Sequence, residues 1–215
     1  MNGLIFTCPM EHPIFFPYQS KQDLADRINE RLGRIKFRRY GNEPNYTPAL
    51  VERLTDFGYE DENVTVTIEG AVMTSVGKGT AEKWSGADFS VVATISKNGE
   101  TVKKGLVFQS KRGTIEDLRK NDKREYVRCE GQIRDMKRLC PNPKVLEIYE
   151  EDGSVPTVVS GTSILSGKDL QHLPFGDWVA KRFLPTFDGR KDPFVVDRLL
   201  DANLSGLKVK FNIKT

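Results

Sequence analysis

The chain has 215 residues, of which 29% are charged and 38% hydrophobic, and these values are typical of a soluble globular protein. Its net charge of +3 permits a polyanionic partner but does not require one. Three cysteines (Cys8, Cys129 and Cys140) form no CxxC pair, which argues against a disulfide framework or a zinc knuckle.

The first eighteen residues, MNGLIFTCPMEHPIFFPY, are apolar but are interrupted by three prolines and carry no basic leader. We therefore expect no signal peptide here, and no later stretch is long enough to span a membrane. A cytoplasmic protein without a membrane partner is the resulting expectation.

The first half of the chain predicts two helices and a strand. Residues 20–35 have apolar side chains one turn apart, which indicates a helix. Residues 47–58 predict a second helix, with Thr47 as its cap, Pro48 in its first turn and Gly58 at its end. Residues 63–73 alternate and are β-branched, so they predict a strand, and a glycine-rich loop follows over 75–86.

A hairpin follows, because residues 87–96 and 101–111 both have strand patterns and Asn98-Gly99 between them is a strong turn signal. Residues 115–139 predict a helix with a buried apolar stripe, and 144–150 predict a short strand. Residues 155–165 are a candidate for a further strand. Later residues predict short helices over 177–185 and 192–204 and a last strand over 207–213.

This order predicts an α/β fold with a mixed central sheet flanked by helices. We divide the chain into an N-terminal helical extension (1–46), a core (47–165) and a C-terminal elaboration packed on the core (166–215).

One end of the predicted hairpin gathers polar side chains. A turn at 98–99 places residue i opposite residue 197 − i, so Asp88 faces Gln109. Lys111 lies one step further on the same face, because alternate side chains of a strand share a face. A carboxylate, an amide and an ammonium group therefore converge beside the glycine-rich loop.

The segments GADF (86–89) and VFQSK (107–111) resemble the D-(x)n-(E/Q)-x-K motif of the PD-(D/E)xK, or restriction-endonuclease-like, nuclease superfamily, in the QxK form of its Mrr-like members. The family's core of a helix, three strands, a helix and a strand (αβββαβ) is similar to the order predicted over residues 47–150. The resemblance implies hydrolysis of phosphodiester bonds with Mg²⁺ or Mn²⁺. It also implies that Asp88 and the side-chain oxygen of Gln109 bind the metal, and that Lys111 orients the water or stabilises developing charge.

The resemblance also implies a further acidic ligand, because a neutral glutamine replaces the commoner acid. Glu52 and Glu82 are favoured over Glu69, although a glutamate on a helix face or in a loop is often merely solvated. Gln132 resembles a helical glutamine of RecB-like members that contacts nucleic acid or positions the lysine, with a plain boundary residue as the alternative. The candidate contacts to the phosphate backbone are Lys78, Lys83, Arg112 and Lys120.

The expected function is that of a DNA nuclease, in prokaryotic defence against foreign DNA by family association. Two alternatives stay open: a catalytically silent binding or assembly subunit with the same fold, and a nuclease acting on RNA. The family suggests a homodimer or a larger defence complex. His12 and His172 are isolated in the sequence and receive no role.

Overall fold

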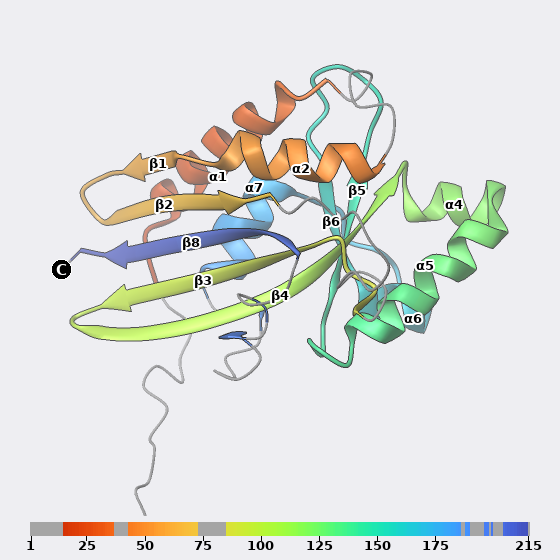
Figure 1. The fold of residues 1–215 in the computed structure, drawn as a ribbon. Helices are drawn as coiled ribbons and strands as arrows, with labels where there is room; N and C mark the ends of the chain where they lie inside the picture. Colours follow the sequence, from red (N-terminus) through yellow and green to blue (C-terminus); the bar gives the residue numbers. More distant parts are fainter. Residues whose placement is uncertain are drawn as a thin grey trace, which may run out of the picture.

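The structure is a computed structural model, which describes residues 15–36, 43–72, 85–185, 188–189, 196–197, 199 and 204–214. These residues form one eight-stranded mixed sheet flanked by helices (Figure 1), with the strand order β1-β2-β8-β3-β4-β5-β6-β7. The predicted mixed α/β class is therefore confirmed. None of the described helices is long and apolar enough to cross a membrane.

The strands are β1 (Phe57–Glu60), β2 (Val64–Ala71), β3 (Phe89–Lys97), β4 (Glu100–Arg112), β5 (Lys144–Ile148), β6 (Thr157–Ser160), β7 (Leu173–Pro174) and β8 (Ser205–Ile213). The helices are α1 (Tyr18–Gly33), α2 (Glu43–Leu54), α4 (Ile115–Asn121), α5 (Lys123–Met136), α6 (Gly161–Ser166), α7 (Phe175–Trp178) and the π-helical turn η2 (Val179–Phe183).

The predicted hairpin is present with the predicted register. Asn98 and Gly99 both have positive φ angles, 52° and 81°, as a tight two-residue turn requires. Strands β3 and β4 are antiparallel, and Phe89 lies opposite Phe108. Strand β5 lies on the other side of β4 and runs parallel to it, so Glu147 lies beside Lys111.

Strand β8 lies inside the sheet, between β2 and β3 (Figure 1), antiparallel to the first and parallel to the second. The strand predicted over 207–213 is therefore confirmed, but the three strands expected to form the core are not consecutive neighbours. Residues 72–88 separate β2 from β3 in the sequence. Strand β8, whose alternate side chains are buried, pairs with both of them and lies between them.

Several predicted boundaries are wrong. Helix α2 begins at Glu43, so Thr47 does not cap it; instead its hydroxyl lies 2.8 Å from that of Ser110 on β4. Gly58 belongs to β1.

The helix predicted over 115–139 is two helices, because the backbone of Asp122 leaves the helical region (φ −137°, ψ 78°) and its side chain caps α5. The strand predicted over 155–165 turns into α6 after Ser160, whose side chain caps that helix.

Alternate side chains divide the sheet into two faces. Phe89 and Phe108 stack on one face, where the rings of Phe175 and Trp178 of α7 cover Phe108. Helix α2 lies on that same face, as the Thr47–Ser110 contact shows. Gln109 and Lys111 lie on the opposite face, which α4 and α5 cover through the buried side chains Ile115, Cys129, Ile133 and Met136.

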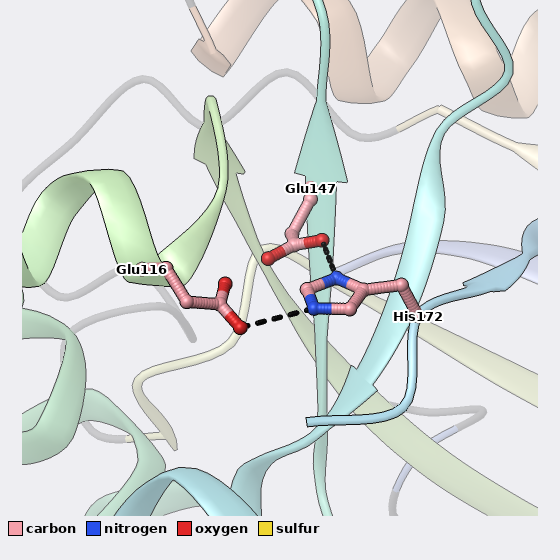
Figure 2. A group of neighbouring side chains, drawn as sticks. All are labelled: Glu116, Glu147 and His172. Atoms are coloured by element: carbon pink, nitrogen blue, oxygen red, sulfur yellow. Dashed lines mark hydrogen bonds and ion pairs between the residues drawn. The ribbon is translucent and has the colours of Figure 1, made fainter. Parts of the chain in front are cut away.

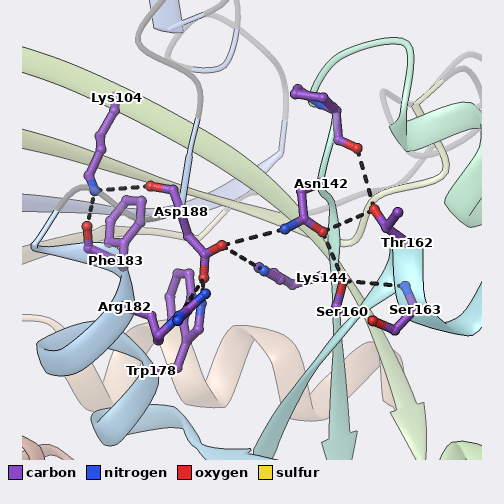
Figure 3. Close-up of polar contacts among 11 residues, drawn as sticks. Lys104, Asn142, Lys144, Ser160, Thr162, Ser163, Trp178, Arg182, Phe183 and Asp188 are labelled. Carbon is purple, nitrogen blue, oxygen red and sulfur yellow. Dashed lines mark hydrogen bonds and ion pairs between the residues drawn. The ribbon is translucent and has the colours of Figure 1, made fainter. Parts of the chain in front are cut away.

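A buried polar network ties the chain after η2 to the sheet (Figure 3). The Asp188 carboxylate accepts hydrogen bonds from Lys144 Nζ at 3.0 Å and from Trp178 Nε1 at 3.0 Å. Lys104, which has no exposed surface, donates to the backbone oxygens of Phe183 and Asp188. These buried ammonium groups thus have acceptors, without which their burial would be very costly.

We predict that Asp188→Ala lowers the free energy of unfolding by roughly 3–5 kcal/mol, because it leaves the Lys144 ammonium group buried without its carboxylate. The side chains of Lys144 and Asp188 are only 6% and 4% exposed. Urea denaturation measures the change. Glu69→Ala is the matched control, since the Glu69–Lys210 pair is exposed on both sides and its loss should change stability little. Equal effects of the two substitutions would contradict a structural role for the network.

Candidate functional site

The predicted meeting of Asp88 and Gln109 occurs at the start of β3. The backbone N–H of Asp88 donates to Phe108 O at 2.8 Å, which extends the hairpin ladder by one step. Its carboxylate oxygen Oδ2 accepts from Gln109 Nε2 and from the backbone N–H of Ser110, both at 2.7 Å. Two donors therefore fix the orientation of a half-buried carboxylate.

The amide oxygen of Gln109 is the atom in this cluster that lacks a partner. The residue is 3% exposed, and its Oε1 finds no hydrogen-bond donor among the described residues. A buried acceptor left unsatisfied costs about 1–3 kcal/mol. A donor or a cation that reaches this oxygen would remove that cost.

Lys111 is 1% exposed, and its Nζ lies 2.6 Å from Glu125 Oε1. Glu125 belongs to the first turn of α5 and is 25% exposed, so it reaches from the helix layer down to the sheet. The sequence alone does not point to Glu125, because its place opposite Lys111 depends on the break between α4 and α5 at Asp122.

Helix α5 also positions the chain just before Asp88. Gly86 has a φ of +69°, and a Cβ there would lie 2.6 Å from the backbone oxygen of Gln132. The backbone of Gln132 thus borders the cluster, whereas the predicted contact of its side chain with nucleic acid or with the lysine stays a prediction. Its side-chain Oε1 is buried and has no donor among the described residues.

The other predicted residues lie elsewhere. Glu52 is exposed on α2, in a hollow lined by Arg31, Arg34, Lys36 and Arg53, and is not part of the Asp88 cluster. Glu69 is exposed on β2 and pairs with Lys210. Arg112 is exposed and pairs with Glu150, and Lys120 is exposed on α4. Glu82, Lys78 and Lys83 lie outside the residues that the structure describes.

A second cluster lies on the same face, one strand further on. Glu116 of α4, Glu147 of β5 and His172 before β7 point toward one another (Figure 2). His172 Nδ1 lies 2.7 Å from Glu147 Oε2, and its Nε2 lies 3.1 Å from Glu116 Oε1.

Glu147 is completely buried, and its negative charge is held by several donors. Oε1 accepts from the backbone N–H of Ile115 at 2.8 Å, and Oε2 accepts from Thr157 Oγ1 at 2.7 Å and from Tyr149 OH at 3.2 Å. Burial, together with the charge of Glu147, raises the pKa of Tyr149 to about 12. The Tyr149 hydroxyl therefore stays protonated and able to donate at neutral pH.

Burial by itself lowers the pKa of His172, but the hydrogen bonds and negative charges of Glu147 and Glu116 outweigh it, so the net shift is upward. In the sequence this histidine is isolated, and no role was predicted for it. A signal was present in the strand KVLEIYE, where Glu147 is an acidic residue among apolar neighbours.

Comparisons with protein-family models, with curated proteins and with solved structures find no match for this chain. Its site must therefore be interpreted from its own geometry.

We predict that Gly86→Ala destabilises the protein more than Gly99→Ala does. Both glycines have positive φ angles, so both substitutions carry a backbone cost of about 1–2 kcal/mol. Only at Gly86 would the new methyl group also collide with a backbone oxygen, whereas Gly99 has open space around its Cβ position. Thermal unfolding of the two variants measures the difference. Equal losses of stability would mean that the backbone of α5 does not contact the chain at Gly86, just before β3.

Proposed function

We propose that this protein is a metal-dependent nuclease that hydrolyses phosphodiester bonds of DNA. The observation that carries the proposal is the buried oxygen of Gln109, which has no donor among the described residues and lies next to the Asp88 carboxylate on the sheet face that also bears Lys111. The motif that resembles PD-(D/E)xK nucleases supports the same assignment.

The donor atoms at this end of the hairpin fit a hard divalent cation. Asp88 offers a carboxylate and Gln109 a neutral amide oxygen, and Mg²⁺ and Mn²⁺ prefer oxygen ligands. Bound there, such an ion would neutralise charge on the phosphate and lower the pKa of an attacking water.

The residues of the chain have separable roles in this proposal. Ser110 N–H and Gln109 Nε2 hold the Asp88 carboxylate in one orientation. Lys111 supplies positive charge next to the scissile phosphate, and Glu125 holds its ammonium group in place at 2.6 Å. The exposed Arg112 and Lys120 are candidates for contacts to the nucleic-acid backbone.

A second candidate function is that of a catalytically silent nucleic-acid-binding or assembly subunit. The observation in its favour is that Lys111 is almost completely buried and already paired with Glu125. A lysine used in this way stabilises the packing of α5 on the sheet without touching a substrate.

The biological setting is proposed from the resemblance alone. It suggests prokaryotic defence against foreign DNA, with the protein acting as a homodimer or within a larger defence complex. RNA is the alternative substrate, because none of the described groups distinguishes ribose from deoxyribose.

The test is cleavage of plasmid DNA, single-stranded DNA and RNA by the purified protein in Mg²⁺, Mn²⁺ or EDTA. We expect cleavage of DNA with either metal and none in EDTA, and a loss of roughly 10²-fold or more for Asp88→Ala and for Lys111→Ala. Asp169→Ala and Lys168→Ala are the matched controls, because they remove an exposed carboxylate and an exposed ammonium group outside the cluster. Absence of cleavage on all three substrates would favour the silent subunit.

We also predict that Gln109→Glu makes the stability of the protein depend on Mg²⁺. The substitution places a second carboxylate beside Asp88, so without metal the two charges repel and the melting temperature falls. Added Mg²⁺ should raise the melting temperature of this variant more than that of the wild type, because two carboxylates bind the ion more tightly. Gln171→Glu, an exposed amide, controls for the added charge. A Mg²⁺ response equal to that of the wild type would argue against an ion at this position.

A further inference from the structure

The cluster of Glu116, Glu147 and His172 has the geometry of a set of metal ligands. Each of the three side chains offers one ligand atom, and these atoms all lie within 4.8 Å of one another. Donor atoms around a tetrahedral zinc ion are roughly 3.3 Å apart, given bond lengths of about 2.0–2.1 Å. In the structure the two carboxylates contact different ring nitrogens, Glu147 at Nδ1 (2.7 Å) and Glu116 at Nε2 (3.1 Å), and one ion can bind only one of these nitrogens. The partly exposed Glu116 side chain would therefore turn for all three residues to share an ion.

The cluster also contains one buried oxygen atom that has no hydrogen-bond donor among the described residues. Glu116 Oε2 is buried and receives no hydrogen bond from the described residues, although its companion Oε1 contacts His172. A carboxylate oxygen in that state lacks both water and a donor. A cation between the three side chains would satisfy it.

The surroundings of Glu147 resemble the outer shell of a metal site. The N–H of Ile115 and the hydroxyls of Thr157 and Tyr149 hold this fully buried carboxylate from three directions. Such outer contacts fix the orientation of a ligand and strengthen metal binding. They also show that the carboxylate is held in place by the fold rather than by a chance contact with His172.

The charges around the cluster leave two carboxylates for one imidazole. Lys111 is the cation that lies beside Glu147 in the strand register, but its Nζ is bonded to Glu125 of α5. The Lys111 ammonium group is therefore paired with Glu125, and it does not neutralise the carboxylates of Glu116 and Glu147 by direct contact. A divalent ion would match this surplus of negative charge.

We propose that Glu116, Glu147 and His172 bind one divalent transition-metal ion of the zinc class. The imidazole selects this class, because Mg²⁺ and Ca²⁺ prefer ligand sets made of oxygen alone. Three protein ligands leave a fourth coordination position open. The proposal does not rest on the nuclease function, since it uses none of Asp88, Gln109 and Lys111.

The first experiment is a titration of EDTA-treated, dialysed full-length protein with Zn²⁺ and, separately, with Mg²⁺, followed by calorimetry and by competition with a chromogenic chelator. We expect at least one equivalent of Zn²⁺ to bind, and one equivalent to lose at least about 10-fold in affinity in His172→Ala and in Glu116→Gln. Any Mg²⁺ binding should be the same in these two variants as in the wild type. Both side chains are partly exposed, at 32% and 44%, so these variants are better suited to the test than a variant of the buried Glu147.

Two controls separate this site from the one proposed for the nuclease. Asp88→Ala should keep the Zn²⁺ equivalent that depends on His172 at the affinity of the wild type, even if it abolishes DNA cleavage. Glu151→Gln, which alters an exposed glutamate nearby in the sequence, should also leave the affinity unchanged. Zinc binding that is lost in Asp88→Ala and kept in His172→Ala would overturn the assignment.

A crystal soaked in Zn²⁺ tests the same proposal without any substitution. An anomalous peak at the zinc absorption edge should lie within about 2.2 Å of a ring nitrogen of His172. A peak elsewhere with none at His172 would overturn the proposal. Absence of binding by the wild type at about 100 μM Zn²⁺ would also overturn it, because the binding free energy would then be weaker than roughly −5.5 kcal/mol.

Discussion

The register of the β3–β4 hairpin is the constraint on which the rest of the site depends. The turn at Asn98-Gly99 places Phe89 opposite Phe108 and therefore Asp88 beside Gln109. A shift of one residue would move every β4 side chain to the other face and separate this pair. The separate, parallel register of β4 and β5 places Glu147 beside Lys111. The turn thus sets the first polar cluster, and the pairing of β5 with β4 places Glu147 of the second cluster beside it.

The polar groups buried on the two faces of the sheet are satisfied in different ways. On the face of Phe108, the ammonium groups of Lys104 and Lys144 have acceptors, and the Asp188 carboxylate has donors. The buried side-chain atoms that lack a partner among the described residues are all oxygens, of Gln109, Glu116 and Gln132. These three belong to β4, α4 and α5, the elements that form or cover the other face. That face therefore has a surplus of acceptors, which donors or cations from outside would satisfy.

The sequence predicted the features that local patterns encode. The Asn-Gly turn and two alternating strands were sufficient to place Asp88 beside Gln109, and the geometry confirms it. The insertion of β8 between β2 and β3 was not predictable, because strand order is a long-range property that periodicity does not contain. The contacts of Glu125 and His172 were not predictable for the same reason. Each reaches its partner only after α5 or the segment before β7 packs on the sheet, whereas Glu147 was visible as a charge inside an apolar strand.

The two clusters are neighbours, but the position of Lys111 separates them electrostatically. Lys111 shares a face with Gln109 and lies beside Glu147, so its ammonium group is within reach of either side by register alone. The Lys111 ammonium group lies 2.6 Å from Glu125 of α5. Glu147 instead contacts His172 and accepts hydrogen bonds from the three donors around it. A cation at Asp88 and Gln109 would therefore not need the ligands of the second cluster. Because neither set of oxygens shares a residue with the other, loss of one site by substitution should leave the other able to bind.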